Sequence, residues 1–328
     1  MNESILSNYS RRDALKTIST GFGYLAFAGL ATEKALAASV TSARGPHFPA
    51  RAKRVIFACM RGGPSHVDTF DHKPDLLRDD GKTTSFGNRK LLGSPFKFPR
   101  HGKSGLPISE LFPHLAKHAD KLCLLNGMHA DAPVHPQCFV QLHTGSFQFV
   151  RPSMGAWVSY GLGTESQNLP GFVTIKPPTR VGGAQNYGSA FMPAVYQGSA
   201  VGSLNDDISK ASIGNLRNKS LSSGLQRKQI DLIQSMNRNL WKEKPSDQRI
   251  DGVIKSYELA YRMQSSVPEL LDVSDEPQSM LDLYGVDKPK TNDFGRQCLL
   301  ARRMVEAGVR YVEVTHANWD QHNGLRGR

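Results

Sequence analysis

Histidine and carboxylate side chains gather in three stretches of this chain, each after an apolar run. The first stretch follows the run at residues 54–60 and reads Arg-Gly-Gly-Pro-Ser-His-Val-Asp-Thr-Phe-Asp. Its His66 and Asp68 offer a nitrogen and an oxygen ligand to a divalent metal ion, and the Gly-Gly pair lets the backbone present N–H groups to an anion. A turn in which Asp68 or Asp71 caps the next helix is an equally good interpretation of these residues.

The second stretch follows the last apolar run, residues 309–314, and contains Asp320 and His322. An Asp-x-His pair in an extended loop places two ligands within reach of one ion, and His316 and Asn318 are near enough to hydrogen-bond such ligands. Exposed loops often contain such pairs, so the position directly after a predicted buried strand carries the argument for a metal site.

The third stretch contains His129, Asp131, His135 and His143. One of these histidines could coordinate a metal ion or shuttle a proton. Each alone is more often a surface histidine or a hydrogen-bonded core histidine, but three histidine-rich clusters at three predicted strand ends favour a shared site.

The sequence does not identify a nucleophile. It contains no Walker loop, no HExxH helix and no GxSxG elbow. A Ser65-His66-Asp68 triad is excluded because residues this close in sequence do not reach triad geometry. Ser65, Thr144 and His135 remain weak candidates for a catalytic role.

Apolar patterning predicts the elements that position these clusters. Continuous apolar runs predict buried strands, and apolar residues at helical spacing predict helices. The expected strands cover residues 54–60, 121–125, 171–175 and 309–314, and the expected helices cover 106–119, stretches within 221–263, 280–284 and 294–307. This order predicts an α/β fold with a mostly parallel sheet flanked by helices, and ligands of such sheets gather beyond the carboxyl ends of the strands.

Composition excludes some classes of protein. The 328 residues are 39% hydrophobic and 21% charged, as in an ordinary globular protein. The net charge of +12 raises the question of nucleic acid, but the basic residues are scattered and no nucleic-acid-binding motif accompanies them. Four separated cysteines without a CxxC pair exclude a zinc ribbon, and they are expected to be buried thiols, with a disulfide possible in an oxidising compartment.

The N-terminus is typical of an export signal. Ser-Arg-Arg-Asp-Ala-Leu-Lys at residues 10–16 matches the twin-arginine pattern, a mildly apolar run follows, and Ala-Leu-Ala at 35–37 offers a cleavage site. We therefore predict a signal peptide at 1–38, a linker at 39–52 and export through the twin-arginine translocon to the periplasm or beyond. The run is short for a bilayer span, so no stable span is expected after cleavage.

Several long motifs resemble one exported family, catalogued as domain of unknown function 1501, whose members are often labelled sulfatase-like. The motifs that carry this resemblance are KRVIFACMRGGPSHVDTFDHKPD (53–75), YELAYRMQ (257–264), PEL (268–270), FGRQCLLARR (294–303) and WDQH (319–322). The family looks like a branch of the alkaline-phosphatase-like superfamily, which hydrolyses phosphate or sulfate esters with divalent metals. The resemblance implies an alkaline-phosphatase-like domain at 53–328, incomplete at the C-terminus, since members continue past the Asp-x-His motif.

The resemblance also implies a site. It makes Asp320 and His322 metal ligands and adds the loop that carries His66 and Asp68. The superfamily usually has an Asp directly after the first strand, where this chain has Arg61 and Gly62, and the sulfatase Cys/Ser-x-Pro-x-Arg motif is absent. The ion could be zinc, calcium or manganese.

Two functions follow as hypotheses. The leading one is an exported metal-dependent hydrolase of sulfate or phosphate esters, acting on a small-molecule or polysaccharide substrate, of which this chain is either an active form or an inactive fragment. The alternative is a non-catalytic exported protein that binds an anionic polysaccharide or a partner protein through its basic surface.

Overall fold

The computed structural model describes residues 51–85, 87–214, 216, 218, 220–243 and 248–324. The predicted signal peptide at 1–38 and most of the predicted linker at 39–52 lie outside these residues. None of the helices in the described ranges has the length and apolarity that a bilayer span requires.

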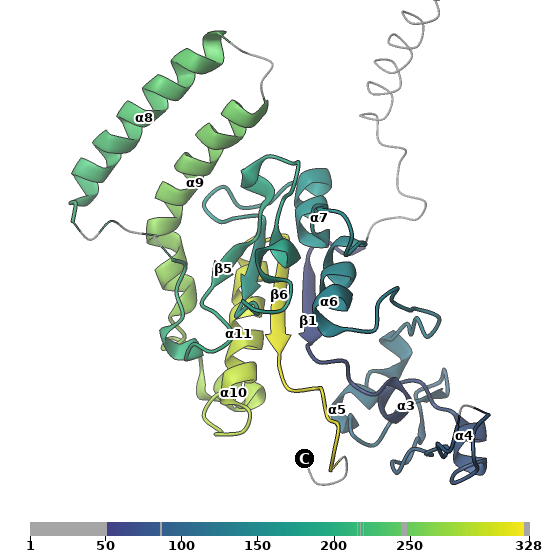
Figure 1. Ribbon diagram of the computed structural model, residues 1–328. Coiled ribbons are helices and arrows are strands. Elements are labelled where there is room, and N and C mark those ends of the chain that lie inside the picture. Colours follow the sequence, from purple (N-terminus) through teal and green to yellow (C-terminus); the bar gives the residue numbers. More distant parts are fainter. Residues whose placement is uncertain are drawn as a thin grey trace, which may run out of the picture. The chain divides into compact units, whose positions relative to one another are not determined.

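A parallel four-stranded sheet with the order β1-β6-β4-β5 lies at the centre of the fold (Figure 1). Its strands are β1 (Val55–Met60), β4 (Phe172–Ile175), β5 (Ser199–Val201) and β6 (Tyr311–His316). Both β4 and the first five residues of β6 are buried, which is why they read as continuous apolar runs. The predicted α/β class with a parallel sheet is confirmed.

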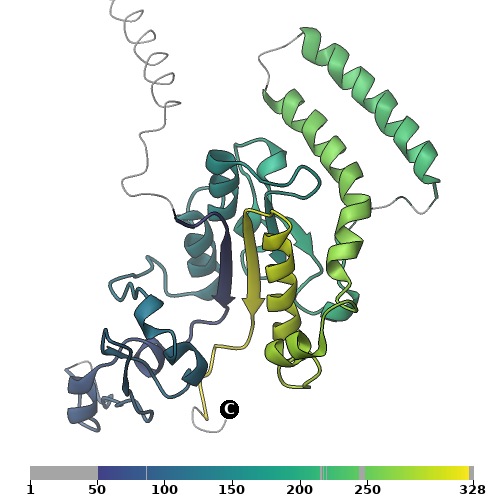
Figure 2. The same cartoon turned by 180° about the vertical axis from the view of Figure 1, so that it is seen from behind.

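Helices cover both faces of the sheet, with α6 and α7 on one face and α11 on the other (Figures 1 and 2). The face toward α11 is apolar, because Val312 and Val314 of β6 pack with Leu299 and Leu300. The opposite face also carries polar side chains, since Glu313 of β6 meets His143 of α6. These helices are α6 (His135–Thr144), α7 (Met154–Leu162) and α11 (Asn292–Glu306).

A long helical pair extends from the sheet domain, as the sequence predicts for residues within 221–263 (Figure 1). It consists of α8 (Ser223–Glu243) and α9 (Gln248–Leu271). Polar contacts join the two helices: Arg227 Nη1 lies 3.0 Å from Glu258 Oε2, and the buried Gln234 donates to the carbonyl of Ile254 at 2.8 Å.

Shorter elements complete the described chain. They are α3 (His66–Thr69), α4 (Pro74–Arg78), β2 (Arg100–His101), β3 (Leu106–Pro107), α5 (Pro113–Ala116), η1 (Ala119–Lys121), η2 (Gly183–Tyr187), η3 (Ala194–Tyr196), η4 (Ile208–Lys210) and α10 (Gln278–Tyr284). Strands β2 and β3 form a separate antiparallel pair.

Two predictions between residues 106 and 125 are wrong. The expected helix at 106–119 is reduced to α5 and η1, because Pro113 disfavours the helical conformation at Phe112, whose φ and ψ are −119° and 58°. The expected strand at 121–125 forms no strand, and Leu125 is 70% exposed. The run is too exposed to be a core strand and pairs with no strand of the described sheet.

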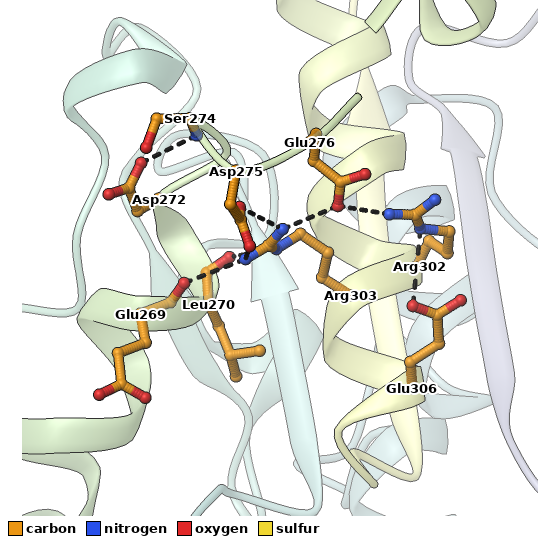
Figure 3. A network of polar contacts seen from close by, with 9 residues as sticks. All are labelled: Glu269, Leu270, Asp272, Ser274, Asp275, Glu276, Arg302, Arg303 and Glu306. Atoms are coloured by element: carbon orange, nitrogen blue, oxygen red, sulfur yellow. Dashed lines mark hydrogen bonds and ion pairs between the residues drawn. The ribbon is translucent and has the colours of Figure 1, made fainter. Parts of the chain in front are cut away.

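An ion-pair network fastens α11 to the segment after α9 (Figure 3). Glu276 Oε1 accepts hydrogen bonds from Arg302 at 2.5 Å and from Arg303 at 2.7 Å, and its side chain is 7% exposed. Arg303 also donates to the Leu270 carbonyl and to Asp275, which is 70% exposed. The hydrogen bonds from Arg302 and Arg303 lower the pKa of Glu276.

We expect Glu276→Gln to lower the free energy of unfolding at neutral pH by about 1–3 kcal/mol, because it removes a shielded charge-assisted pair. The control Asp275→Asn removes an exposed partner of the same Arg303 and should cost less than about 1 kcal/mol. Urea unfolding of wild type and the two variants measures the free energy of unfolding of each. An equal decrease in Glu276→Gln and Asp275→Asn would contradict the prediction that Glu276 contributes more than Asp275.

The ion pairs of Glu276 with Arg302 and Arg303 also predict that the stability of the protein depends on pH. The pKa of Glu276 is lower in the folded than in the unfolded chain, so its contribution to stability is fully present above the ordinary glutamate pKa of about 4.5 and is lost as the pH falls through the lowered folded pKa. The stability difference between wild type and Glu276→Gln should shrink across that acid range.

Candidate functional site

Strands β1 and β6 end side by side, so the segments that follow them run together. Met60 pairs with His316 at the last position of the register. Beyond the strands, the Arg61 N–H donates to the His316 carbonyl at 2.8 Å, and the Trp319 N–H donates to the Arg61 carbonyl at 3.1 Å. The first and second polar stretches of the sequence therefore meet at one edge of the sheet.

Gly62 permits this meeting. Its φ is +117°, a value that side-chain-bearing residues rarely adopt, and a Cβ atom there would lie 2.5 Å from the backbone nitrogen of Asp320. Gly63 also has a positive φ, of +75°, but a Cβ atom would meet nothing within 4 Å. Of the two adjacent glycines, Gly62 sets how closely the Asp320 loop approaches β1.

The Asp320 carboxylate lies between two imidazoles. Its Oδ2 is 3.0 Å from His135 Nε2, and its Oδ1 is 2.8 Å from His322 Nε2. His135 begins α6, whereas His322 follows β6, so two distant segments supply the ring nitrogens. The three side chains are 52%, 42% and 78% exposed in the order His135, Asp320, His322, and solvent reaches all of them.

A cavity of about 850 Å³ opens beside this cluster, lined by the Gly62-Gly63 turn, His135, Asp320 and residues of α6. A second cavity of about 560 Å³ adjoins it and includes His316 and Trp319. Arg61, Asn318 and Gln321 line both cavities. Burial lowers the pKa of His316, against the nearby charge of Asp293, so its ring is neutral at neutral pH.

His66 and Asp68 lie on a helix, whereas Asp320 and His322 lie in the segment that follows β6. That helix is α3, where Asp68 is buried and the exposed His66 ring is 4.0 Å from Asp71 Oδ2. A hydrogen bond from Lys73 is the main cause of the lowered pKa of Asp71. Within the described ranges, no group of three ligand atoms joins these residues to Asp320 and His322. The role of His66 and Asp68 as metal ligands stays a prediction.

The three weak candidates for a catalytic role lie at helix ends. Ser65 precedes α3, and its carbonyl accepts the Thr69 hydroxyl at 3.0 Å. Thr144 ends α6, and its Oγ1 lies 2.8 Å from the Val140 carbonyl and 2.7 Å from that of Ser146. Of the three candidates, only His135 lines the cavity at the strand ends.

One polar group in the core was not foreseen as a site. Among the described residues, the single set of three metal-type ligands within 4.8 Å of one another is Cys59, His143 and Glu313. The sequence signal was a lone carboxylate inside the apolar run at 309–314. All four cysteines are free thiols.

Comparison with known protein families identifies the family of this chain. The model of the family described as "Protein of unknown function (DUF1501)" matches residues 52–328. No curated protein and no solved structure matches the chain.

The glycine pair gives a test of the strand-end geometry. We expect Gly62→Ala to shift the nitrogen NMR signals of His135 and His322, because a methyl group must displace the backbone of Asp320. Gly63→Ala carries a similar backbone strain of about 1–2 kcal/mol but no clash, so its histidine signals should stay close to wild type. Equal shifts in both variants would show that Gly62 does not position Asp320.

Proposed function

The chain belongs to the DUF1501 family, and we propose that it is a metal-dependent hydrolase of sulfate or phosphate esters with its centre at the carboxyl ends of β1 and β6. The observation that carries this proposal is the Asp320 carboxylate held between the ring nitrogens of His135 and His322. The cluster lies at the sheet edge where ligands of parallel α/β proteins gather.

The donor set is of the type that binds a divalent cation, but its three ligand atoms do not all lie within 4.8 Å of one another, so the two imidazoles must draw closer together around an ion. His135 and His322 both direct Nε2 toward the same carboxylate, and two imidazoles with one carboxylate suit zinc or manganese better than calcium, which prefers oxygen ligands. When bound, such an ion supplies Lewis-acid stabilisation of the ester oxygens and a more acidic water. His66 and Asp68, on α3, form no group of three ligand atoms with this centre.

Other residues of the chain suit an anionic substrate. Arg61 lies between the two cavities, and its Nε is buried without a hydrogen-bond partner among the described residues. A guanidinium binds the oxygens of a sulfate or phosphate group through paired N–H donors. We assign Arg61 to substrate binding, and His135, Asp320 and His322 to binding of the cation.

We further propose that the protein works outside the cytoplasm, in the periplasm or beyond. The support is the twin-arginine pattern at residues 10–16 and the Ala-Leu-Ala sequence at 35–37.

A metal-dependent ester hydrolase should lose activity when Asp320 is changed. We expect Asp320→Asn and His135→Gln each to lower hydrolysis of 4-nitrophenyl sulfate or phosphate by more than about 100-fold, because each removes a ligand of the cation. Chelator should abolish the wild-type activity and zinc or manganese should restore it. The control His118→Gln changes an exposed histidine that lines neither cavity and should keep full activity.

The competing function has its own signature in the same experiment. A net charge of +12 favours binding of an anionic polysaccharide without turnover. Salt-sensitive binding of a sulfated glycan, with no ester cleavage at any metal concentration, would overturn the hydrolase proposal and support the binding protein.

A further inference from the structure

A set of three buried ligand-type side chains lies between the sheet and α6. Cys59 comes from β1, Glu313 from β6 and His143 from α6, and their relative exposures are 3%, 1% and 3%. One sulfur, one ring nitrogen and one carboxylate oxygen lie within 4.8 Å of one another. Because three rigid core elements supply these atoms, their arrangement is fixed by the fold.

The imidazole of His143 is oriented at both nitrogens. Nδ1 lies 2.7 Å from the carbonyl of Phe139, which can only accept, so Nδ1 carries a hydrogen. Nε2 then faces Glu313 Oε1 at 3.0 Å. A neutral ring would point a lone pair at a carboxylate, so Nε2 either carries a proton, which makes an imidazolium paired with Glu313, or faces a bound cation. A backbone carbonyl on the second nitrogen is also the usual arrangement of a metal-binding histidine.

The carboxylate of Glu313 has few other partners. The Thr315 hydroxyl is 3.5 Å from Oε1, the outer limit of a hydrogen bond. Thr174 lies opposite Glu313 in the β4–β6 register, is fully buried, and its Oγ1 has no hydrogen-bond partner among the described residues. A buried carboxylate with so little hydrogen bonding is costly unless a cation balances it.

Cys59 completes the donor set. Burial and the neighbouring Glu313 raise the pKa of the thiol to about 12, so without a cation it stays protonated and unreactive. A bound transition metal deprotonates a coordinating thiol and so adds a soft sulfur ligand. Sulfur, imidazole and carboxylate together match zinc rather than calcium or magnesium.

We propose that Cys59, His143 and Glu313 bind one divalent transition-metal ion of the zinc type inside the protein. The three residues supply three of the four ligands that zinc usually takes, and their burial gives a substrate no access to the site, which points to a structural role. The site joins β1, β6 and α6, the three elements that carry the strand-end cluster. It uses none of the residues of the proposed hydrolase centre and does not depend on that function.

Cobalt substitution tests the site, because a thiolate ligand gives cobalt a charge-transfer band that nitrogen and oxygen ligands do not. The full chain is purified under reducing conditions from cells grown with cobalt, since the closed site must load during folding. We expect the band in wild type, its loss in Cys59→Ser, and a fall in its intensity of about tenfold or more in His143→Gln and Glu313→Gln.

Variants of the other cysteines test whether Cys59 is the residue that supplies the sulfur ligand. Cys138 lines the strand-end cavity and Cys298 lies on α11, so Cys138→Ser and Cys298→Ser must keep the band. Asp320→Asn must keep it as well, which separates this site from the hydrolase centre. A band that survives Cys59→Ser, or that disappears in Cys138→Ser, would overturn the proposal.

A second measurement covers variants that fail to fold. X-ray absorption at the zinc edge of the Cys138→Ser protein should show one sulfur at about 2.3 Å and nitrogen or oxygen at about 2.0–2.1 Å. Folded protein without zinc or cobalt, or with a metal shell that lacks sulfur, would show that a protonated His143 alone balances Glu313.

Discussion

The parallel register between β1 and β6 is the constraint on which the rest of the structure depends. These strands lie about 250 residues apart in the chain, yet Val55 pairs with Tyr311 and Met60 with His316, so both strands start and end at the same level. Their following loops must then share one sheet edge, and the hydrogen bonds between Arg61, His316 and Trp319 continue the pairing past the strands. The candidate site is a consequence of this register.

Successive side chains of β6 point to opposite faces of the sheet, and the two faces differ in polarity. Val312 and Val314 point toward α11 and build the apolar core, where packing fixes the helix against the sheet. Tyr311, Glu313 and Thr315 point to the other face, which α6 covers. The polar face costs stability unless its groups find partners, and His143 of α6 is the partner of Glu313.

The sequence predicted a strand or helix correctly where a single pattern, an apolar run or apolar residues at helical spacing, determined the local structure. Apolar runs located β1, β4 and β6, and helical spacing located α8, α9, α10 and α11. It failed at residues 106–125, where Pro113 outweighed apolar spacing and where an apolar run without a sheet partner stayed a loop. It placed Asp320 and His322 in one loop and expected a histidine of the third stretch to share their site, but it did not single out His135 or predict that His143 turns inward to Glu313, since both contacts depend on how α6 lies across the sheet.

Helix α6 couples the core to the strand-end cluster. It begins with His135, whose ring contacts Asp320, and close to its end His143 contacts Glu313. The two histidines are eight residues apart, about 12 Å along a helix, and the two carboxylates come from one continuous segment that leaves β6. Each His–carboxylate pair therefore restrains a different end of helix α6. Because α6 cannot slide without breaking the buried pair, the core contact at His143 holds His135 in place beside Asp320, although water surrounds that outer pair.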